Sequence, residues 1–311
     1  MSLLTKRETL TQNITYMAIM AAVNAIFSLI AALLPIASLF LMIVLPLSSA
    51  IVFLFCRHRY YVIYAFATIA LCLLITIFDM SFTVFYVVPS LITGYIFGLL
   101  IKYKFHAVWI ILFASIAQGL FTALTIPLVN VLFEVDLILI FKGFMQVGGS
   151  PNIDLIIPTF LFFLALVQMI FSYIVVNYEI TKFGYEVNDQ PLNPVFYSYY
   201  LLGALASTVA FSFFLPSGAY LLLAVALYFM FFIVFSFVGS KQYKVLIASG
   251  VSLVVFMFLF AFFYPLLPAP FGLLLTGILP LLVAGISLVN NVLLTFAHKD
   301  KMERTGKEKQ E

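Results

Sequence analysis

Residues that could do chemistry are few in this chain, and they stand at the ends of long apolar segments. Only 9% of the 311 residues are charged, against roughly 25% in a soluble domain. The sequence contains no P-loop and no H-E-x-x-H motif, and its histidines and two cysteines do not have the spacing of a metal site. These patterns argue against an enzyme, and we expect no metal or other cofactor.

The segments that must position these residues are apolar enough to cross a membrane. The chain is 65% hydrophobic, with a mean hydropathy of +1.21, and a spanning helix needs about 20 mostly apolar residues. Breaks at charges, prolines and glycines predict ten helices, over residues 11–34, 36–55, 60–78, 83–101, 106–133, 155–178, 195–214, 219–238, 245–264 and 270–297. Pro35 and Pro46 could instead make the second segment re-entrant or broken. We therefore predict an all-α, polytopic transmembrane bundle of about ten helices.

The positions of the basic residues test this division and orient it. With the N-terminus inside, fourteen of the fifteen Lys and Arg fall on the inner side, and only Lys142 falls outside. Cytoplasmic loops carry such an excess of positive charge, and one miscounted span would invert every later loop. We therefore predict that both termini are cytoplasmic and that the protein lies in the bacterial cytoplasmic membrane, with the lipid bilayer around it.

A polar linker divides the predicted helices into two sets. It reads EITKFGYEVNDQPLNP and runs from Glu179 to Pro194. We predict a six-helix membrane domain over residues 1–180 and a four-helix membrane domain over residues 195–297. The charged segment 298–311 is expected to be a disordered cytoplasmic tail.

The outer connection over residues 134–154 is the most site-like segment. It combines acids, one base, amides and glycines, and Pro127 and Pro158 interrupt the flanking helices, which frees backbone groups to face a cavity. Four carboxylates against one ammonium on the outer side favour a cationic or hydrogen-bond-donating ligand. An ordinary solvated loop would have the same composition. The predicted ligand-binding residues are Asp79, Glu134, Asp136, Lys142, Gln146, Asn152 and Asp154.

Polar and small side chains inside the predicted helices have two interpretations each. The amides are Asn24, Gln118, Gln168, Asn290 and Asn291. They could line a polar cavity or, more commonly, join helices by hydrogen bonds. Small residues at four-residue spacing permit close helix packing, either internal or with a partner helix. They are Ala18 with Ala22 and Ala21 with Ala25 in the first helix, and Ser90, Gly94 and Gly98 in the fourth.

Part of the chain resembles a known class of transport protein. The segments TQNITYMAIMAAVNAIFSLIAALLP, RHRYY and VVPSLITGYIFGLLIKYK are similar to those of the substrate-capture (S) components of energy-coupling factor transporters, over about residues 1–180. The resemblance implies capture of a vitamin or another micronutrient from the outer face. It also implies that the first-helix alanines Ala18, Ala21, Ala22 and Ala25 dock on a transmembrane coupling protein driven by ATPase subunits. No ligand residue carries over.

The whole chain more closely resembles the YybS-like family of bacterial membrane proteins, which has a similar length and a similarly placed linker. Two functions therefore stay open. The first is capture of a small solute for a transporter energised by partner subunits, because no acidic or basic residue for ion coupling lies within the predicted helices. The second is a non-transporting scaffold or accessory protein. No nucleic-acid partner is expected.

Overall fold

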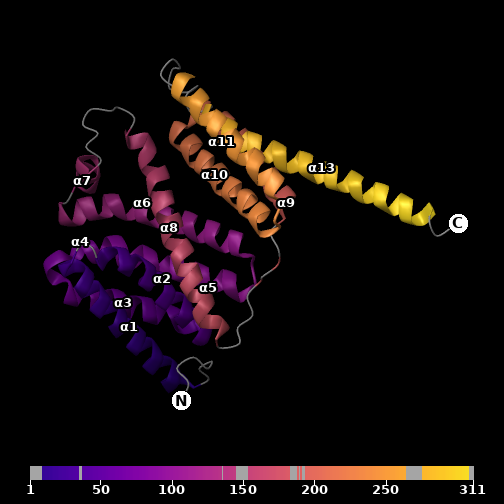
Figure 1. Cartoon of the computed structure of the whole chain (residues 1–311). Helices are drawn as coiled ribbons and strands as arrows, with labels where there is room; N and C mark the ends of the chain where they lie inside the picture. Colours follow the sequence, from indigo (N-terminus) through magenta and orange to yellow (C-terminus); the bar gives the residue numbers. More distant parts are fainter. Residues whose placement is uncertain are drawn as a thin grey trace. The chain divides into compact units, whose positions relative to one another are not determined.

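The structure is a computed structural model, and it describes residues 9–34, 37–134, 136–144, 153–182, 188, 190, 193–263 and 275–307. Every regular element in this part of the chain is helical (Figure 1), which confirms the predicted all-α class. The described residues contain nine segments long and apolar enough to cross a membrane, and α2 adds the shorter apolar stretch Ile43–Phe55. The chain is therefore a polytopic membrane protein.

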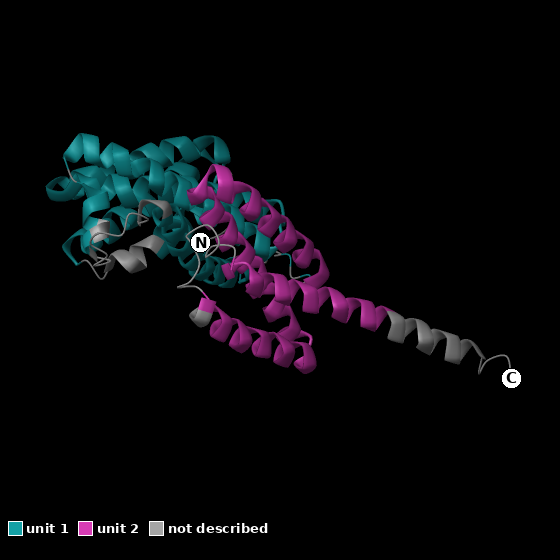
Figure 2. Ribbon diagram, turned by 90° about the horizontal axis from the view of Figure 1, so that it is seen from above, with its two compact units in different colours: residues 1–190 teal, residues 191–311 magenta. Residues whose placement is uncertain are grey.

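The chain divides into two compact units, residues 1–190 and 191–311, coloured separately in Figure 2. The boundary lies within the polar linker, whose Asn188 Nδ2 donates to the Lys104 carbonyl at 3.1 Å. The helices of the first unit are α1 Leu10–Leu33, α2 Ala37–Phe55, α3 Tyr61–Ile75, α4 Met80–Phe82, α5 Val88–Lys102, α6 Ala107–Phe133, α7 Leu137–Phe144 and α8 Ile153–Thr181. The shorter turns are η1 His58–Tyr60, η2 Ile77–Asp79 and η3 Thr83–Val87. The second unit contains α9 Pro194–Phe214, α10 Pro216–Gly239, α11 Tyr243–Phe263 and α13 Ile278–Lys307.

Helix α2 is the central helix of the first unit, because α1, α5 and α8 all pack against it. It runs for 19 residues without a break at Pro46. At 1.5 Å per residue its length is about 28 Å, close to the roughly 30 Å of a bilayer core. The structure therefore favours a spanning second helix over a broken one.

Glycines bring α5 into close contact with α2. A Cβ atom built at Gly94 would lie 2.3 Å from Ser49 Cβ, and one built at Gly98 would lie 2.8 Å from Phe53 Cδ1. Either distance is shorter than a van der Waals contact, so only glycine permits this approach. The small residues of the fourth predicted span thus serve internal packing, one of the two interpretations that their spacing allowed.

Helix ends are set by local signals in the sequence. Thr9 and Gln12 form a reciprocal capping box at the start of α1. Asn193 accepts hydrogen bonds from two backbone N–H groups at the start of α9, and Pro194 follows at the first helical position. These signals explain why the observed helices begin close to the predicted positions.

The C-terminal segment differs from the prediction of a disordered tail, because α13 continues as far as Lys307. Residues 299–304 read KDKMER, and Lys, Met, Glu and Arg have high helix propensity. Extending an existing helix avoids the cost of nucleating a new one. The charged tail is therefore a continuation of the last membrane helix.

Candidate functional site

A small cavity lies inside the first unit, between η3, α6 and α8. Its volume is about 20 Å³, enough for about one water molecule. It is lined by Phe85, Tyr86, Gln118, Thr122, Leu161, Leu164, Ala165 and Gln168. Two of the amides identified in the sequence therefore meet at one place, although 50 residues separate them along the chain.

The π-helical turn η3 supplies the aromatic wall of the cavity. It covers Thr83–Val87 and leads directly into α5, whose early proline is Pro89. Proline has no N–H, so the α-helical hydrogen bond to the carbonyl of residue 85 cannot form. Thr76 and Thr83 share a 2.6 Å hydrogen bond between their hydroxyls, which ties the turn to the end of α3. A π turn within a helix frequently marks a functional site.

The polar groups of the cavity are incompletely satisfied. Gln118 Nε2 donates to Thr122 Oγ1 at 3.4 Å, a long hydrogen bond. The other amide atom, Gln118 Oε1, is buried and has no hydrogen-bond partner among the residues that the structure describes. A buried acceptor without a partner costs about 1–3 kcal/mol. The cavity therefore offers a strong acceptor to any hydrogen-bond donor that enters.

The cavity lining carries no charged side chain. Its polar surface comes from two amides, one Thr hydroxyl and one Tyr hydroxyl, and the remaining lining side chains are apolar. Close approach of α6 to α8 is possible beside it, since a Cβ atom at Gly119 would lie 3.5 Å from the Phe162 Cα. This arrangement suits binding of a small neutral group.

A hydrophobic cluster adjoins the cavity on the side of α7. It consists of the buried residues Phe85, Ile126, Val129 and Leu161, and α7 contributes Leu137 and Ile138 to it. Phe85 and Leu161 belong to both the cluster and the cavity wall. We call these four buried residues, together with Leu137 and Ile138, the apolar cluster. It lies towards the end of the unit that the charge distribution assigns to the outer face.

Two of the predicted ligand-binding acids cap helices. Asp79 Oδ1 accepts from the Phe82 N–H at 3.2 Å at the start of α4. Asp136 Oδ1 accepts from the Leu139 N–H at 3.0 Å at the start of α7. Both roles are typical of aspartate at an N-cap.

The other predicted ligand residues are spread over the connection. Glu134 is exposed and ends α6 in the left-handed conformation, with φ of 56°. Lys142 belongs to α7 and Asp154 to the first turn of α8, but their side chains lie outside what the structure describes, as do Gln146 and Asn152 entirely. Among the described side chains, no hydrogen bond or ion pair joins Asp79, Glu134 and Asp136 to one another.

The other amides in the helices join helices. Asn24 Nδ2 donates to the Tyr64 hydroxyl at 2.8 Å, and Asn24 Oδ1 accepts from Ser48 at 2.7 Å. This one side chain thus connects α1, α2 and α3. In the second unit, Asn290 Nδ2 donates to Gln242 Oε1 at 2.8 Å, whereas Asn291 is exposed.

The two overlapping alanine pairs of α1 lie on adjacent sides of the helix and differ in burial. Ala21 and Ala25 are each 1% exposed and pack inside the unit. Ala18 and Ala22 are exposed, and they form one row with the exposed Ile14 and Ile26. A partner helix could therefore contact Ala18 and Ala22, while Ala21 and Ala25 serve the unit's own packing.

The sequence analysis identified Gln118 and Gln168 among the cavity residues and missed the other two polar ones, Tyr86 and Thr122, as well as the apolar ones. Pro89 was a usable signal for Tyr86, because it breaks the helical hydrogen-bond ladder one turn later.

No protein-family model matches the chain, and no curated protein or solved structure is significantly similar to it. Within the described residues, no group of three His, Cys, Asp or Glu side chains could hold a metal ion.

Proposed function

We propose that this membrane protein captures a small, hydrogen-bond-donating solute from the outer face for a transporter energised by partner subunits. The observation that carries the proposal is the buried, partnerless Gln118 Oε1 beside Thr122 and Gln168. Six buried side-chain atoms in the described residues have no hydrogen-bond partner, and Gln118 Oε1 is the one among them whose residue lines this cavity. A ligand that donates a hydrogen bond to this oxygen would satisfy it.

The chemistry of the cavity defines the class of ligand. The part of the ligand that enters is uncharged, because the lining contains no counter-ion and a lone charge would be costly there. Exposed Glu134 and Asp136 supply negative potential on the outer side, which attracts ligands with a cationic part. A small polar micronutrient with amine or amide N–H groups has both properties.

Ligand entry requires the site to open. The cavity of about 20 Å³ is far below the roughly 300–1,000 Å³ of small-molecule pockets. In this proposal the apolar cluster moves when the site opens, because two of its residues belong to α7, a helix of only eight residues. Displacement of Leu137 and Ile138 would enlarge the cavity towards the outer face, and ligand binding would favour the enlarged state.

Energy for release comes from other proteins in this proposal. The sequence has no P-loop, and the cavity lining has no ionisable carboxylate or amine to couple an ion gradient. The exposed row of Ile14, Ala18, Ala22 and Ile26 on α1 is where a transmembrane coupling protein would dock, because small side chains let two helices approach closely.

The test is copurification from the native membrane in mild detergent. Coupling and ATPase subunits that copurify with the wild-type protein support the proposal. Their absence, together with stable association with unrelated membrane proteins, would favour a scaffold. That alternative has support in the capping roles of Asp79 and Asp136, which occupy two of the acids expected at a ligand.

A charge-only variant tests the role of the outer acids. Glu134→Gln combined with Asp136→Asn removes two charges but keeps the helix cap, because Asn caps as well as Asp. Slower ligand association that becomes independent of ionic strength is expected if these acids attract the ligand. An unchanged association rate would show that they only connect α6 to α7.

A further inference from the structure

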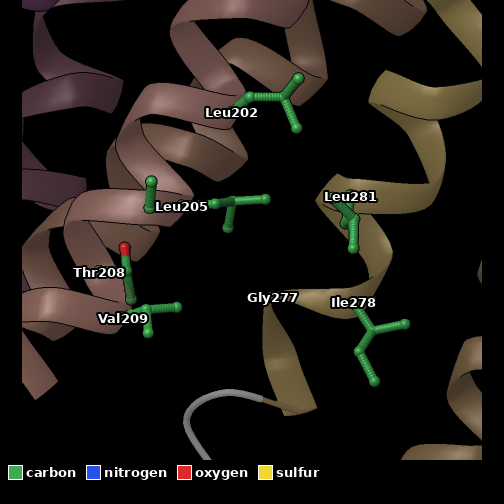
Figure 3. A pocket seen from close by; sticks show the side chains of 8 residues that line it. Leu202, Leu205, Thr208, Val209, Gly277, Ile278 and Leu281 are labelled. Atoms are coloured by element: carbon green, nitrogen blue, oxygen red, sulfur yellow. The ribbon is translucent and has the colours of Figure 1, made fainter.

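A second and larger cavity lies within the unit of residues 191–311, between α9 and α13. Its volume is about 400 Å³, and Figure 3 shows Leu205 of α9 pointing into the space towards Leu281 of α13. It is open on one side. Its walls are formed mainly by Leu202, Leu205, Ala206, Val209, Ile278 and Leu281.

The lining residues that the structure describes offer no free polar side chain to a ligand. Their one side-chain oxygen belongs to Thr208, whose hydroxyl donates to the Ala204 carbonyl of the same helix at 2.8 Å. Water in a cavity needs two to four polar partners, and polar solutes need placed donors or acceptors. The occupant is therefore hydrocarbon.

The shape of the space separates the apolar occupants. An α-helix is about 10–12 Å in diameter with its side chains, so a helix from a partner or a second copy would cover the open side of the cavity without filling the space between α9 and α13. A single flexible alkyl chain can enter that space. Helices α9 and α13 belong to candidate membrane spans, for which bilayer hydrocarbon is the solvent.

We propose that this cavity binds one acyl chain of a membrane phospholipid between α9 and α13. The lining residues lie around the middle of α9 and at the first turn of α13. The charge distribution assigns the start of α13 to the outer face, so the chain enters from the outer leaflet and ends near the middle of α9. The bound chain completes the packing of α9 on α13. This inference does not depend on the proposed function.

Photolabelling in lipid nanodiscs tests the proposal. The probe is a phosphatidylcholine with a diazirine near the end of one acyl chain, mixed at a low fraction into unlabelled phosphatidylcholine. After illumination, mass spectrometry of peptides maps the adducts. We expect at least a several-fold higher adduct yield per residue on residues 202–209 and 277–281 than on the exposed α11 residues Val251, Leu253 and Val254.

A cavity-filling variant supplies the second measurement. Ala206→Trp places a large side chain in the cavity and should reduce its adducts several-fold, whereas the matched control Val251→Trp should leave them unchanged. Equal yields on the cavity and on α11 in the wild-type protein would overturn the proposal, even if the Trp variant failed to fold. So would an Ala206→Trp protein that folds and keeps the full cavity yield.

Discussion

Gln118 and Thr122 lie one turn apart on α6 and share a 3.4 Å hydrogen bond that uses only the amide nitrogen of Gln118. Among the described residues, the amide oxygen is buried and has no hydrogen-bond partner. It is therefore available to a hydrogen-bond donor that enters the cavity. The proposed ligand site rests on this relationship.

Removal of the unsatisfied oxygen should stabilise the empty protein. Gln118→Leu keeps the side chain's approximate volume and deletes a buried acceptor whose desolvation costs about 1–3 kcal/mol. We expect the thermal midpoint in detergent, followed by far-ultraviolet circular dichroism, to rise. Gln242→Leu is the matched control, because Gln242 accepts from Asn290 at 2.8 Å and its loss should lower the midpoint. Equal destabilisation by both changes would contradict this account.

Gly94 should tolerate no side chain. Gly94→Ala forces a Cβ atom against Ser49 Cβ and the Pro46 carbonyl, and overpacking of this kind costs about 1–3 kcal/mol. Gly203→Ala is the control, since a Cβ atom there would meet nothing within 4 Å. We expect a lower thermal midpoint and less monodisperse protein for the first variant only. A neutral Gly94→Ala would mean that α2 and α5 are not in such close contact.

The sequence was sufficient to predict an all-α polytopic membrane protein, because apolar length reports directly on a membrane environment. It predicted ten spans, and the described residues contain nine segments long and apolar enough to cross a membrane, with the shorter apolar stretch Ile43–Phe55 in α2. It was also sufficient to single out Gly94 and Gly98. It could not separate Ala18 from Ala21, since apolar residues occur on both the buried and the exposed sides of α1, and hydrophobic periodicity then carries little information about which side is buried. It also missed Tyr86 and Thr122. Aromatic residues and threonines are common in this sequence, and only the packing of η3, α6 and α8 shows that these two line a cavity.

The assignment of inner and outer faces remains a prediction and can be tested with single cysteines. Cys56 and Cys72 are buried and can be replaced by alanine or serine. Cysteine at exposed Glu134 should react with an impermeant maleimide in intact cells. Cysteine at exposed Lys182 or Lys241 should react only after permeabilisation. The reverse labelling at either end would invalidate the ten-span topology.

Substitution of an exposed alanine of α1 should weaken association with a partner, whereas substitution of a buried one should impair folding. Ala22→Trp should leave the yield of monodisperse protein unchanged but weaken copurification with coupling subunits, because the indole holds two helices apart. Ala21→Trp should reduce the folded protein itself, since Ala21 is 1% exposed. Unaltered copurification of a well-folded Ala22→Trp protein would exclude this face of α1 as the docking surface.

Ligand-induced stabilisation of Gln118 variants tests the central claim most directly. The purified wild-type protein is screened against small amine- and amide-containing micronutrients for a rise in thermal midpoint, and the best compound is then titrated against Gln118→Leu and Gln242→Leu. The proposal predicts that the wild-type and Gln242→Leu proteins retain the ligand-induced shift, whereas Gln118→Leu loses most of it while remaining folded. A shift of full size in Gln118→Leu would show that the solute does not bind at this cavity.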